Sequence, residues 1–277
     1  MKVLVIGAGN MGLTYGASIG QSGYLDKEDL MIYDKSTEVV EKLREKNNPN
    51  YEVYDDLEEC LPISDIIFIA VKPYHNDALM EEMKPMMNDQ QLAISIMAGV
   101  TIDTIQAGLG IQKVVRAMPN LPAQVGKGMT SYLAAPEISR IELWMVEDLL
   151  NSTGKSVRVD SEKFIDASTG ISGSGPAYVF YFMESMMEAA RNMGFSDNDS
   201  KVLVSQTFEG AIELFNKNKL SPKGWMKRVA SKGGTTQAAL DSFDDNNVHN
   251  LIREAAYAAF NRAIELGKPE EEVELEK

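Results

Sequence analysis

Three glycines within the first twelve residues have the spacing of a dinucleotide-binding turn. Gly7, Gly9 and Gly12 follow the apolar run 3–6 and precede an amphipathic stretch that ends near residue 22. The first glycine permits a tight turn, the second lets the backbone approach a pyrophosphate, and the third allows close packing of helix on strand. The strand–helix context disfavours the alternative, a glycine turn without a ligand. The predicted cofactor-binding residues here are Ile6, Gly7, Ala8, Gly9, Asn10, Met11 and Gly12.

An acidic residue at the end of the next expected strand is a second nucleotide signal. Asp34 lies 22 residues after Gly12, where a carboxylate accepts hydrogen bonds from the adenosine ribose hydroxyls and disfavours a 2′-phosphate. Lys35 and Ser36 favour the opposite choice, because a cation and a hydroxyl group bind phosphate. In another interpretation the three residues form a polar turn in which Ser36 caps a helix. The sequence therefore predicts NAD or NADP and leaves the choice between them open.

Three further segments rich in breaker residues follow expected strands, at 70–73, 97–100 and 116–122. In parallel sheets, ligands bind outside the carboxyl ends of the strands, so we expect these segments to line the cofactor. The alternative is that they are ordinary loops. The predicted contributors are Ala70, Val71, Lys72, Pro73, Met97, Ala98, Gly99 and Asn120.

Composition argues against several kinds of partner. The 277 residues carry a formal charge of -14, which disfavours nucleic acid and anionic membranes as partners. A single cysteine, Cys60, leaves no intrachain disulfide and fits a reducing compartment. The two histidines, His75 and His249, are far apart and form no zinc cluster, so we expect surface histidines and no metal. With no apolar run near the roughly 20 residues of a membrane span and no signal pattern, we expect a cytoplasmic protein.

Apolar spacing divides the chain into two halves. In the first half, short strands rich in β-branched residues alternate with helices, which predicts an α/β fold with a doubly wound parallel sheet of Rossmann type. We predict strands at 3–6, 30–33, 66–71, 92–97, 114–118, 129–133 and 156–159. We predict helices between them at 11–22, 37–45, 78–87, 101–107 and 136–151.

After Asp160 the strand-like runs disappear and apolar residues recur at helical spacing. We predict helices at 162–169, 177–193, 197–216, 222–230, 236–241 and 248–266. These helices are apolar around much of their circumference, which indicates burial against a partner subunit. The predicted organisation is a dinucleotide-binding domain over 1–160, an all-helical dimerisation and substrate domain over 161–267, and an acidic tail over 268–277.

Two loops of small residues, 170–178 and 230–236, interrupt the helical half. Each glycine costs a helix about 1 kcal/mol relative to alanine, so such loops are unusual in a helical domain. The second loop can present several backbone N–H groups and hydroxyls at a helix N-terminus, where a small carboxylate would bind. In the alternative, both loops are helix-breaking turns in which Thr235 or Thr236 serves only as an N-cap.

In order and spacing, these motifs resemble those of the pyrroline-5-carboxylate reductase family. The matching segments are 7–12, 71–73, 98–100, 116–120, 172–178 and 231–236, and the resemblance extends from residue 1 to about 267. It implies an NAD(P)-dependent enzyme that reduces 1-pyrroline-5-carboxylate to L-proline, the last step of proline biosynthesis. It also implies a homodimer formed through the helical domain, often assembled further into rings such as decamers.

The resemblance also implies roles for residues of the helical half. It places the substrate carboxylate on the loop 231–236 and the ring nitrogen on Thr236, which is the expected catalytic residue. Glu162 matches a family position near bound proline. The expected substrate-binding residues are Glu162, Ser231, Gly233, Gly234, Thr235 and Thr236.

Several residues depart from the family pattern. Lys232 replaces a usual proline, Arg228 stands where a neutral residue is common, and Asp55 and Asp56 fall near a position that often carries asparagine beside the adenosine phosphate. The family resemblance implies NADPH as the cofactor, and the acidic pair, with Asp34, leaves NADH open.

Three alternative functions stay open. A hydroxy-acid dehydrogenase needs a lysine or histidine at its glycine-rich helix start, and the segment 172–178 contains neither. A reductase of another cyclic imino acid is compatible with every motif, because the sequence does not determine the size of the substrate pocket. Lys232 keeps open a non-catalytic, dinucleotide-binding paralogue.

Overall fold

The computed structural model describes residues 1–46, 48 and 50–266 of the chain, so the predicted tail at 268–277 lies outside the described residues. The described residues form two compact units, one made of Met1–Ser174 with residues 259–266, the other of Gly175–Ala258. The predicted boundary lies near Asp160 instead. The difference arises because α7 (Glu162–Ser168) packs on the sheet of the first unit.

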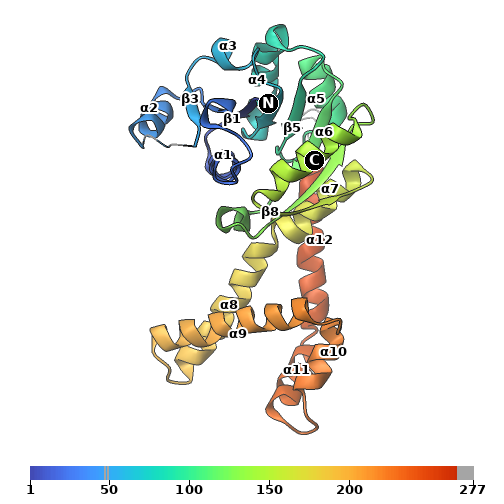
Figure 1. Cartoon of the computed structure of the whole chain (residues 1–277). Coiled ribbons are helices and arrows are strands. Elements are labelled where there is room, and N and C mark those ends of the chain that lie inside the picture. Colours follow the sequence, from blue (N-terminus) through green and yellow to red (C-terminus); the bar gives the residue numbers. More distant parts are fainter. Residues whose placement is uncertain (47, 49, 267–277) are drawn as a thin grey trace. The chain divides into compact units, whose positions relative to one another are not determined.

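An eight-stranded sheet forms the centre of the first unit (Figure 1). The strand order is β3-β2-β1-β4-β5-β6-β7-β8, and β1 pairs in parallel with both β2 and β4. The doubly wound α/β fold is thus confirmed. The strands are β1 (Val3–Ile6), β2 (Leu30–Tyr33), β3 (Glu52–Tyr54), β4 (Ile66–Ile69), β5 (Leu92–Ser95), β6 (Val114–Met118), β7 (Gly128–Ala134) and β8 (Gly154–Arg158).

The expectation of a parallel sheet was wrong for the last two strands. β7 runs antiparallel to β6, and β8 is parallel to β7. Residues 119–127, which join β6 to β7 and hold only one short 3-10 segment (Leu121–Val125), explain the reversal. A parallel connection needs a crossover of about a dozen residues or more, usually with a helix, and this connection is shorter.

Helices cover both faces of the sheet because successive strand residues point to opposite sides. Leu4 and Ile6 of β1 belong to a core cluster shared with α3, α4 and α5, whereas Val3 and Val5 belong to a cluster shared with α1, α2 and α6. The helices are α1 (Asn10–Gln21), α2 (Thr37–Lys46), α3 (Leu57–Cys60), α4 (Asn76–Met83), α5 (Ile102–Leu109) and α6 (Arg140–Asn151). β3 and α3, of three and four residues, were not predicted, because elements this short carry no periodic signal.

The second unit is entirely helical in its described residues. Ser196 and Ser221 cap α9 and α10 by accepting hydrogen bonds from Asp199 N and Gly224 N, which confirms the predicted starts of these helices. A π-helical turn (Thr169–Gly173) precedes α8. The helices are α8 (Gly175–Asn192), α9 (Asp197–Lys217), α10 (Pro222–Val229), α11 (Thr235–Asp245) and α12 (Val248–Leu266), of which α12 continues into the first unit.

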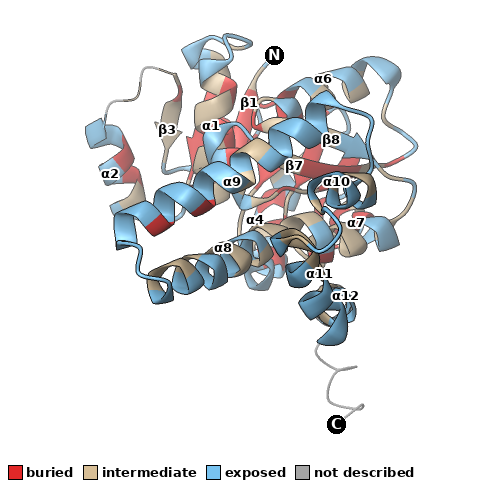
Figure 2. Cartoon of the chain, turned by 90° about the horizontal axis from the view of Figure 1, so that it is seen from below, coloured by how far each residue is buried: buried red, intermediate tan, exposed pale blue. Residues whose placement is uncertain are grey.

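Burial differs sharply along the chain. In Figure 2 the central strands are mostly red, for buried residues, while α8 to α12 are mostly pale blue or tan. Between Gly175 and Ala258, only Ser200 and Val204 are buried. The hydrophobic core of the chain therefore lies in the first unit, around the sheet that carries the glycine turn.

Candidate active site

The glycine turn between β1 and α1 has the geometry that its spacing predicts. Gly7 has a φ of +99°, and its N–H donates to the carbonyl of Tyr33 at 2.8 Å. A Cβ atom on Gly12 would lie 1.9 Å from the carbonyl oxygen of Gly7, so no larger residue fits there. A Cβ on Gly9 would meet no atom within 4 Å, and no side chain caps α1. Open space before an uncapped helix N-terminus is the environment that a pyrophosphate needs.

A pocket of ≈ 480 Å³ lies beside this turn. The predicted cofactor residues that line it are Ile6, Gly7, Gly9, Asp34, Lys35, Ser36, Ala70, Val71 and Lys72. Sequence reasoning missed a second group, which comes from β2, α4 and the turn before α4: Tyr33, His75, Ala78, Leu79 and Glu82. His75 is exposed, as predicted, yet contributes to the rim. No motif marks these positions: Tyr33 ends β2, and the other four reach the pocket through the packing of α4 and the turn before it.

The remaining predicted cofactor residues lie outside the described lining of this pocket. Ala8, Asn10, Met11 and Gly12 form the turn and the first helical turn, Pro73 begins a short 3-10 turn, and Met97, Ala98 and Gly99 follow β5. Their contacts with a cofactor stay predictions.

Asn120 ties two segments of the first unit together. Its amide nitrogen donates to the carbonyl of Ser172 at 2.9 Å, and its amide oxygen accepts from the N–H of Met129 at 2.8 Å. The side chain thus joins the end of β6 to the π-helical turn and to β7. Both groups of the Asn120 amide are therefore bonded to the protein backbone, and its contact with a cofactor stays a prediction.

The residues after β2 hold one another in place. The carboxylate of Asp34 accepts from Ala8 N at 2.7 Å and from Ser36 N at 2.9 Å. Lys35 Nζ lies 3.4 Å from a carboxylate oxygen of Glu82. Burial, with the nearby charges of Glu82 and Asp34, raises the pKa of Tyr33 to about 12. This end of the pocket is therefore rich in negative charge.

The two acidic residues after β3 are held by groups of the protein itself. Asp55 forms a two-point ion pair with Arg44, at 2.9 and 3.1 Å. This pair lowers the pKa of Asp55. Asp56 caps α3 by accepting from Glu58 N at 2.8 Å. Neither aspartate belongs to the described lining of the pocket beside the glycine turn.

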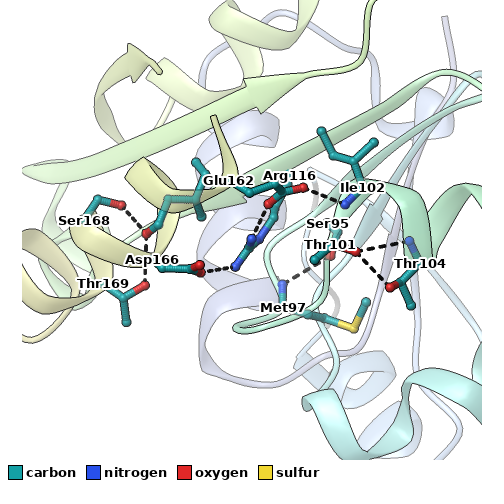
Figure 3. Close-up of polar contacts among 11 residues, drawn as sticks. Ser95, Met97, Thr101, Ile102, Thr104, Arg116, Glu162, Asp166, Ser168 and Thr169 are labelled. Atoms are coloured by element: carbon teal, nitrogen blue, oxygen red, sulfur yellow. Dashed lines mark hydrogen bonds and ion pairs between the residues drawn. The ribbon is translucent and has the colours of Figure 1, made fainter. Parts of the chain in front are cut away.

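A buried ion cluster joins β6 to α7 (Figure 3). Arg116 is only 2% exposed, and its guanidinium pairs with Glu162 and, at 2.6 Å, with Asp166, one helical turn apart on α7. The other carboxylate oxygen of Glu162 accepts from Ile102 N at the start of α5, at 2.8 Å. A buried guanidinium is stable only when it is paired. Both oxygens of Glu162 therefore bond to the protein, and its predicted contact with substrate stays a prediction.

The loop 231–236 forms a compact turn at the start of α11. Gly233 has a φ of +74°, Gly234 N donates to Ser231 O at 2.9 Å, and Gly234 caps α11 without a side-chain hydrogen bond. Thr235 is the first helical residue, one position earlier than predicted, and neither threonine is the N-cap. An uncapped N-terminus next to a hydroxyl-bearing residue, Ser231, suits a small carboxylate.

Two of the residues that depart from the family pattern lie in this loop and just before it. Lys232 is exposed. The guanidinium of Arg228 lies 5.5 Å from the centre of the Trp225 ring, a cation–π distance within α10.

Two properties of the described residues bear on metal binding and membrane insertion. These residues contain no group of three or more His, Cys, Asp or Glu side chains that could hold a metal ion. None of the described helices is both long and apolar enough to cross a bilayer.

Comparison with known proteins agrees with this architecture. Residues 162–266 match the family described as pyrroline-5-carboxylate reductase dimerisation, and residues 2–99 match the family described as NADP oxidoreductase, coenzyme F420-dependent. The chain is 31% identical to a pyrroline-5-carboxylate reductase of Staphylococcus saprophyticus, over 98% of this chain and 100% of that protein.

Two solved structures are similar over nearly their whole length. A pyrroline-5-carboxylate reductase from Coxiella burnetii has a TM-score of 0.89 at 31% identity and covers 97% of this chain and 99% of its own. A pyrroline carboxylate reductase from Plasmodium falciparum with NADP bound has a TM-score of 0.86 at 31% identity, covering 97% and 98%. From the full-length similarity, the nucleotide turn and the dimerisation helices together, we conclude that this chain belongs to the pyrroline-5-carboxylate reductase family.

Proposed function

We propose that this chain catalyses the reaction for which its family is named, the reduction of 1-pyrroline-5-carboxylate to L-proline with NADH or NADPH. The observation that carries the proposal is similarity over 98% of the chain to a reductase of this name. The glycine turn and the loop 231–236, which supply the two kinds of binding site that the reaction needs, are both present within that length.

The reaction converts a C=N bond to an amine. Bound NAD(P)H supplies a hydride to C5 of the imine, and the ring nitrogen takes up a proton. Such a transfer requires mainly that the reactants be held in the right orientation. The chain provides for this with the open space at Gly9 and the uncapped start of α1 at the cofactor end.

We assign the substrate to the loop 231–236. The free N–H groups at the start of α11 and the hydroxyl of Ser231 would bind the carboxylate, and the hydroxyl of Thr236 would orient the ring nitrogen. A threonine hydroxyl is too weak an acid to protonate the nitrogen alone. The proton therefore comes from water or is already present on an iminium substrate.

Replacement of Thr236 by alanine tests this assignment. We expect Thr236→Ala to lower kcat at least about tenfold while the Kd for NADH stays unchanged, because only the orientation of the nitrogen is lost. Thr236→Ser, which keeps the hydroxyl, should retain most of the activity. Unchanged turnover in Thr236→Ala would remove Thr236 from the mechanism.

We further propose a homodimer built through residues 162–266, with a decamer as the candidate higher assembly, and a location in the cytoplasm. Large apolar side chains of the second unit are exposed in the single chain, and the free thiol of Cys60 fits a reducing compartment. Sedimentation velocity on the purified protein distinguishes monomer, dimer and decamer.

A further inference from the structure

The adenosine end of the cofactor pocket decides between NADH and NADPH, which differ by one phosphate on the ribose 2′-oxygen. A protein that accepts this phosphate needs a cation or hydroxyl that is free to bind it. Among the cations and hydroxyls after β2 and in α2, Lys35 and Ser36 line the pocket, and Arg44, the arginine of α2, is the third candidate. The structure shows what each of them does.

Two of the three candidates are already engaged. The hydroxyl of Ser36 lies 3.5 Å from Val39 N in the first turn of α2, in the manner of a helix cap. The guanidinium of Arg44 makes both of its short contacts with Asp55 and a third, at 3.3 Å, with the carbonyl of Val53. Arg44 is thus held by Asp55 and Val53, whereas Ser36 accepts from Val39 N and keeps one neutral O–H that it can donate.

The third candidate, Lys35, is paired with an acid from another element. Its ammonium lies 3.4 Å from Glu82, which α4 carries to the pocket rim. The Lys35 side chain is 81% exposed, so the pair is weak and the lysine can swing away. When Lys35 moves away, the carboxylate of Glu82 still lines the cofactor pocket. The charges of Lys35 and Glu82 cancel, so the pair adds no net positive charge to this pocket.

Asp34, directly after β2, supplies a second carboxylate to the same pocket. Each of its oxygens accepts one backbone N–H, from Ala8 and from Ser36. An ionised carboxylate has about four acceptor positions, so about two remain for ribose hydroxyls. Asp34 and Glu82 therefore both present a carboxylate to the same pocket.

Lys72 also lines the pocket but belongs to its other side. It follows β4, which pairs with β1 on the edge opposite to β2. The lysine thus stands beside the glycine turn, where a diphosphate carries its charge, and away from Asp34.

We infer that this chain prefers NADH to NADPH, and that Glu82 on α4, acting with Asp34, sets the preference by repelling a 2′-phosphate and by neutralising Lys35. The inference rests on the proposed function only in that the chain uses a nicotinamide cofactor. Glu82 is a specificity residue that no sequence motif marks, because it lies nearly fifty residues from Asp34 in the chain.

Equilibrium binding measures this preference without turnover. We would titrate the purified protein with NADH and with NADPH by isothermal calorimetry. For the wild type we expect NADH to bind at least about tenfold more tightly, since a phosphate dianion would approach two carboxylates at an effective dielectric constant near 20. Added salt should narrow the gap, because it screens exposed charges.

Two variants of neighbouring residues isolate the contribution of Glu82. Glu82→Gln should tighten NADPH binding by about three- to tenfold and leave the Kd for NADH within about twofold. Glu81→Gln, on the same helix but lining the separate pocket between α4 and α5, removes the same charge and should change neither value. If the two variants changed the Kd for NADPH equally, Glu82 would act only through the net charge of the protein, and the inference would be wrong.

A double variant tests the part played by Lys35. In Glu82→Gln the lysine is released, so Glu82→Gln/Lys35→Gln should lose much of the gain for NADPH. Lys35→Gln alone should change NADPH binding little. A large loss of NADPH affinity in Lys35→Gln alone would show that the lysine already serves a phosphate.

The outcome separates this inference from the proposed function. Wild-type protein that binds NADPH as tightly as NADH overturns the inference, whatever its activity. Protein that binds NADH preferentially but reduces no 1-pyrroline-5-carboxylate supports the inference and contradicts the proposed function.

Discussion

The two compact units of this chain differ in what they bury. The first unit encloses its apolar side chains on both faces of an eight-stranded sheet. The second leaves large apolar side chains in solvent along α8, α9 and α12, among them Phe180, Ile212 and Tyr257. A helical unit that buries only Ser200 and Val204 among its described residues has no sufficient core of its own. The first unit thus encloses its own core, whereas the second exposes an apolar surface of the kind that the proposed homodimer would cover.

The same contrast holds for charge. The first unit contains the only charged side chain that is buried in the described part of the protein, Arg116, and supplies it with two carboxylates. The ion pair of Arg191 with Glu184 in the second unit lies at the surface of the single chain. Ion pairs of these two kinds differ in energy, because only the buried one leaves a desolvated charge when it is broken.

The largest effect on folding is expected from removal of the buried cation. Arg116→Ala should lower the free energy of unfolding by about 3–5 kcal/mol, because Glu162 and Asp166 lose their partner beside a new cavity. Urea unfolding followed by circular dichroism measures this loss. Arg191→Ala, the surface counterpart, should leave the transition nearly unchanged. A similar shift in both variants would contradict the contrast between buried and exposed pairs.

A charged residue introduced into the exposed apolar surface of the second unit should weaken dimerisation. Ile212, 59% exposed on α9, is predicted to lie against a partner subunit, so Ile212→Glu should weaken the dimer about a hundredfold or more. Sedimentation equilibrium gives the dissociation constant directly. Trp144→Glu is the matched control, since Trp144 is 75% exposed on α6 and lies outside the dimerisation match at 162–266. If the Ile212 variant assembled like the control, α9 would not form the interface.

The smallest effect concerns a partly exposed pair of the first unit and depends on pH. Burial alone would raise the pKa of Glu142, but hydrogen bonds from Lys113 and Ser139 outweigh it and lower the pKa below its usual 4.5. A carboxyl with a lowered folded pKa stabilises the protein above the unfolded value, and that contribution is lost as the pH falls through the folded pKa.

Glu142→Gln should therefore destabilise the protein slightly at pH 7, by roughly 0.5 kcal/mol or less, since solvent screens the pair. The difference from wild type should shrink as the pH falls below about 4.5, where the wild-type carboxyl also becomes neutral. Urea midpoints of both proteins at neutral and acidic pH provide the test. If the difference in stability between wild type and Glu142→Gln grew as the pH fell, the lowered pKa of Glu142 could not be its cause.

Much of the architecture could be predicted from local pattern. Strands β1, β2 and β6 and helix α12 have the predicted bounds, because runs of apolar residues and glycine breaks determine where such elements begin and end. The functions of Gly7 and Gly12 were also predictable, since backbone sterics alone demand glycine at these two positions.

Other features required the packed structure. The direction of β7, the pairing of Asp55 with Arg44 and the bonds of Asn120 join segments whose relative placement no local pattern encodes. Glu82 reaches the cofactor pocket for the same reason, through the packing of α4.

Local sequence pattern was sufficient for most of the elements, the nucleotide turn and the family motifs, because these depend on residues close together in the chain. The bonds of Glu162 to Arg116 and Ile102, and the presence of Glu82 with Asp34 in one pocket, follow from tertiary packing. The physical reason is that an ion pair or a pocket wall depends on distance in space. That distance is set by how the whole sheet and its helices pack.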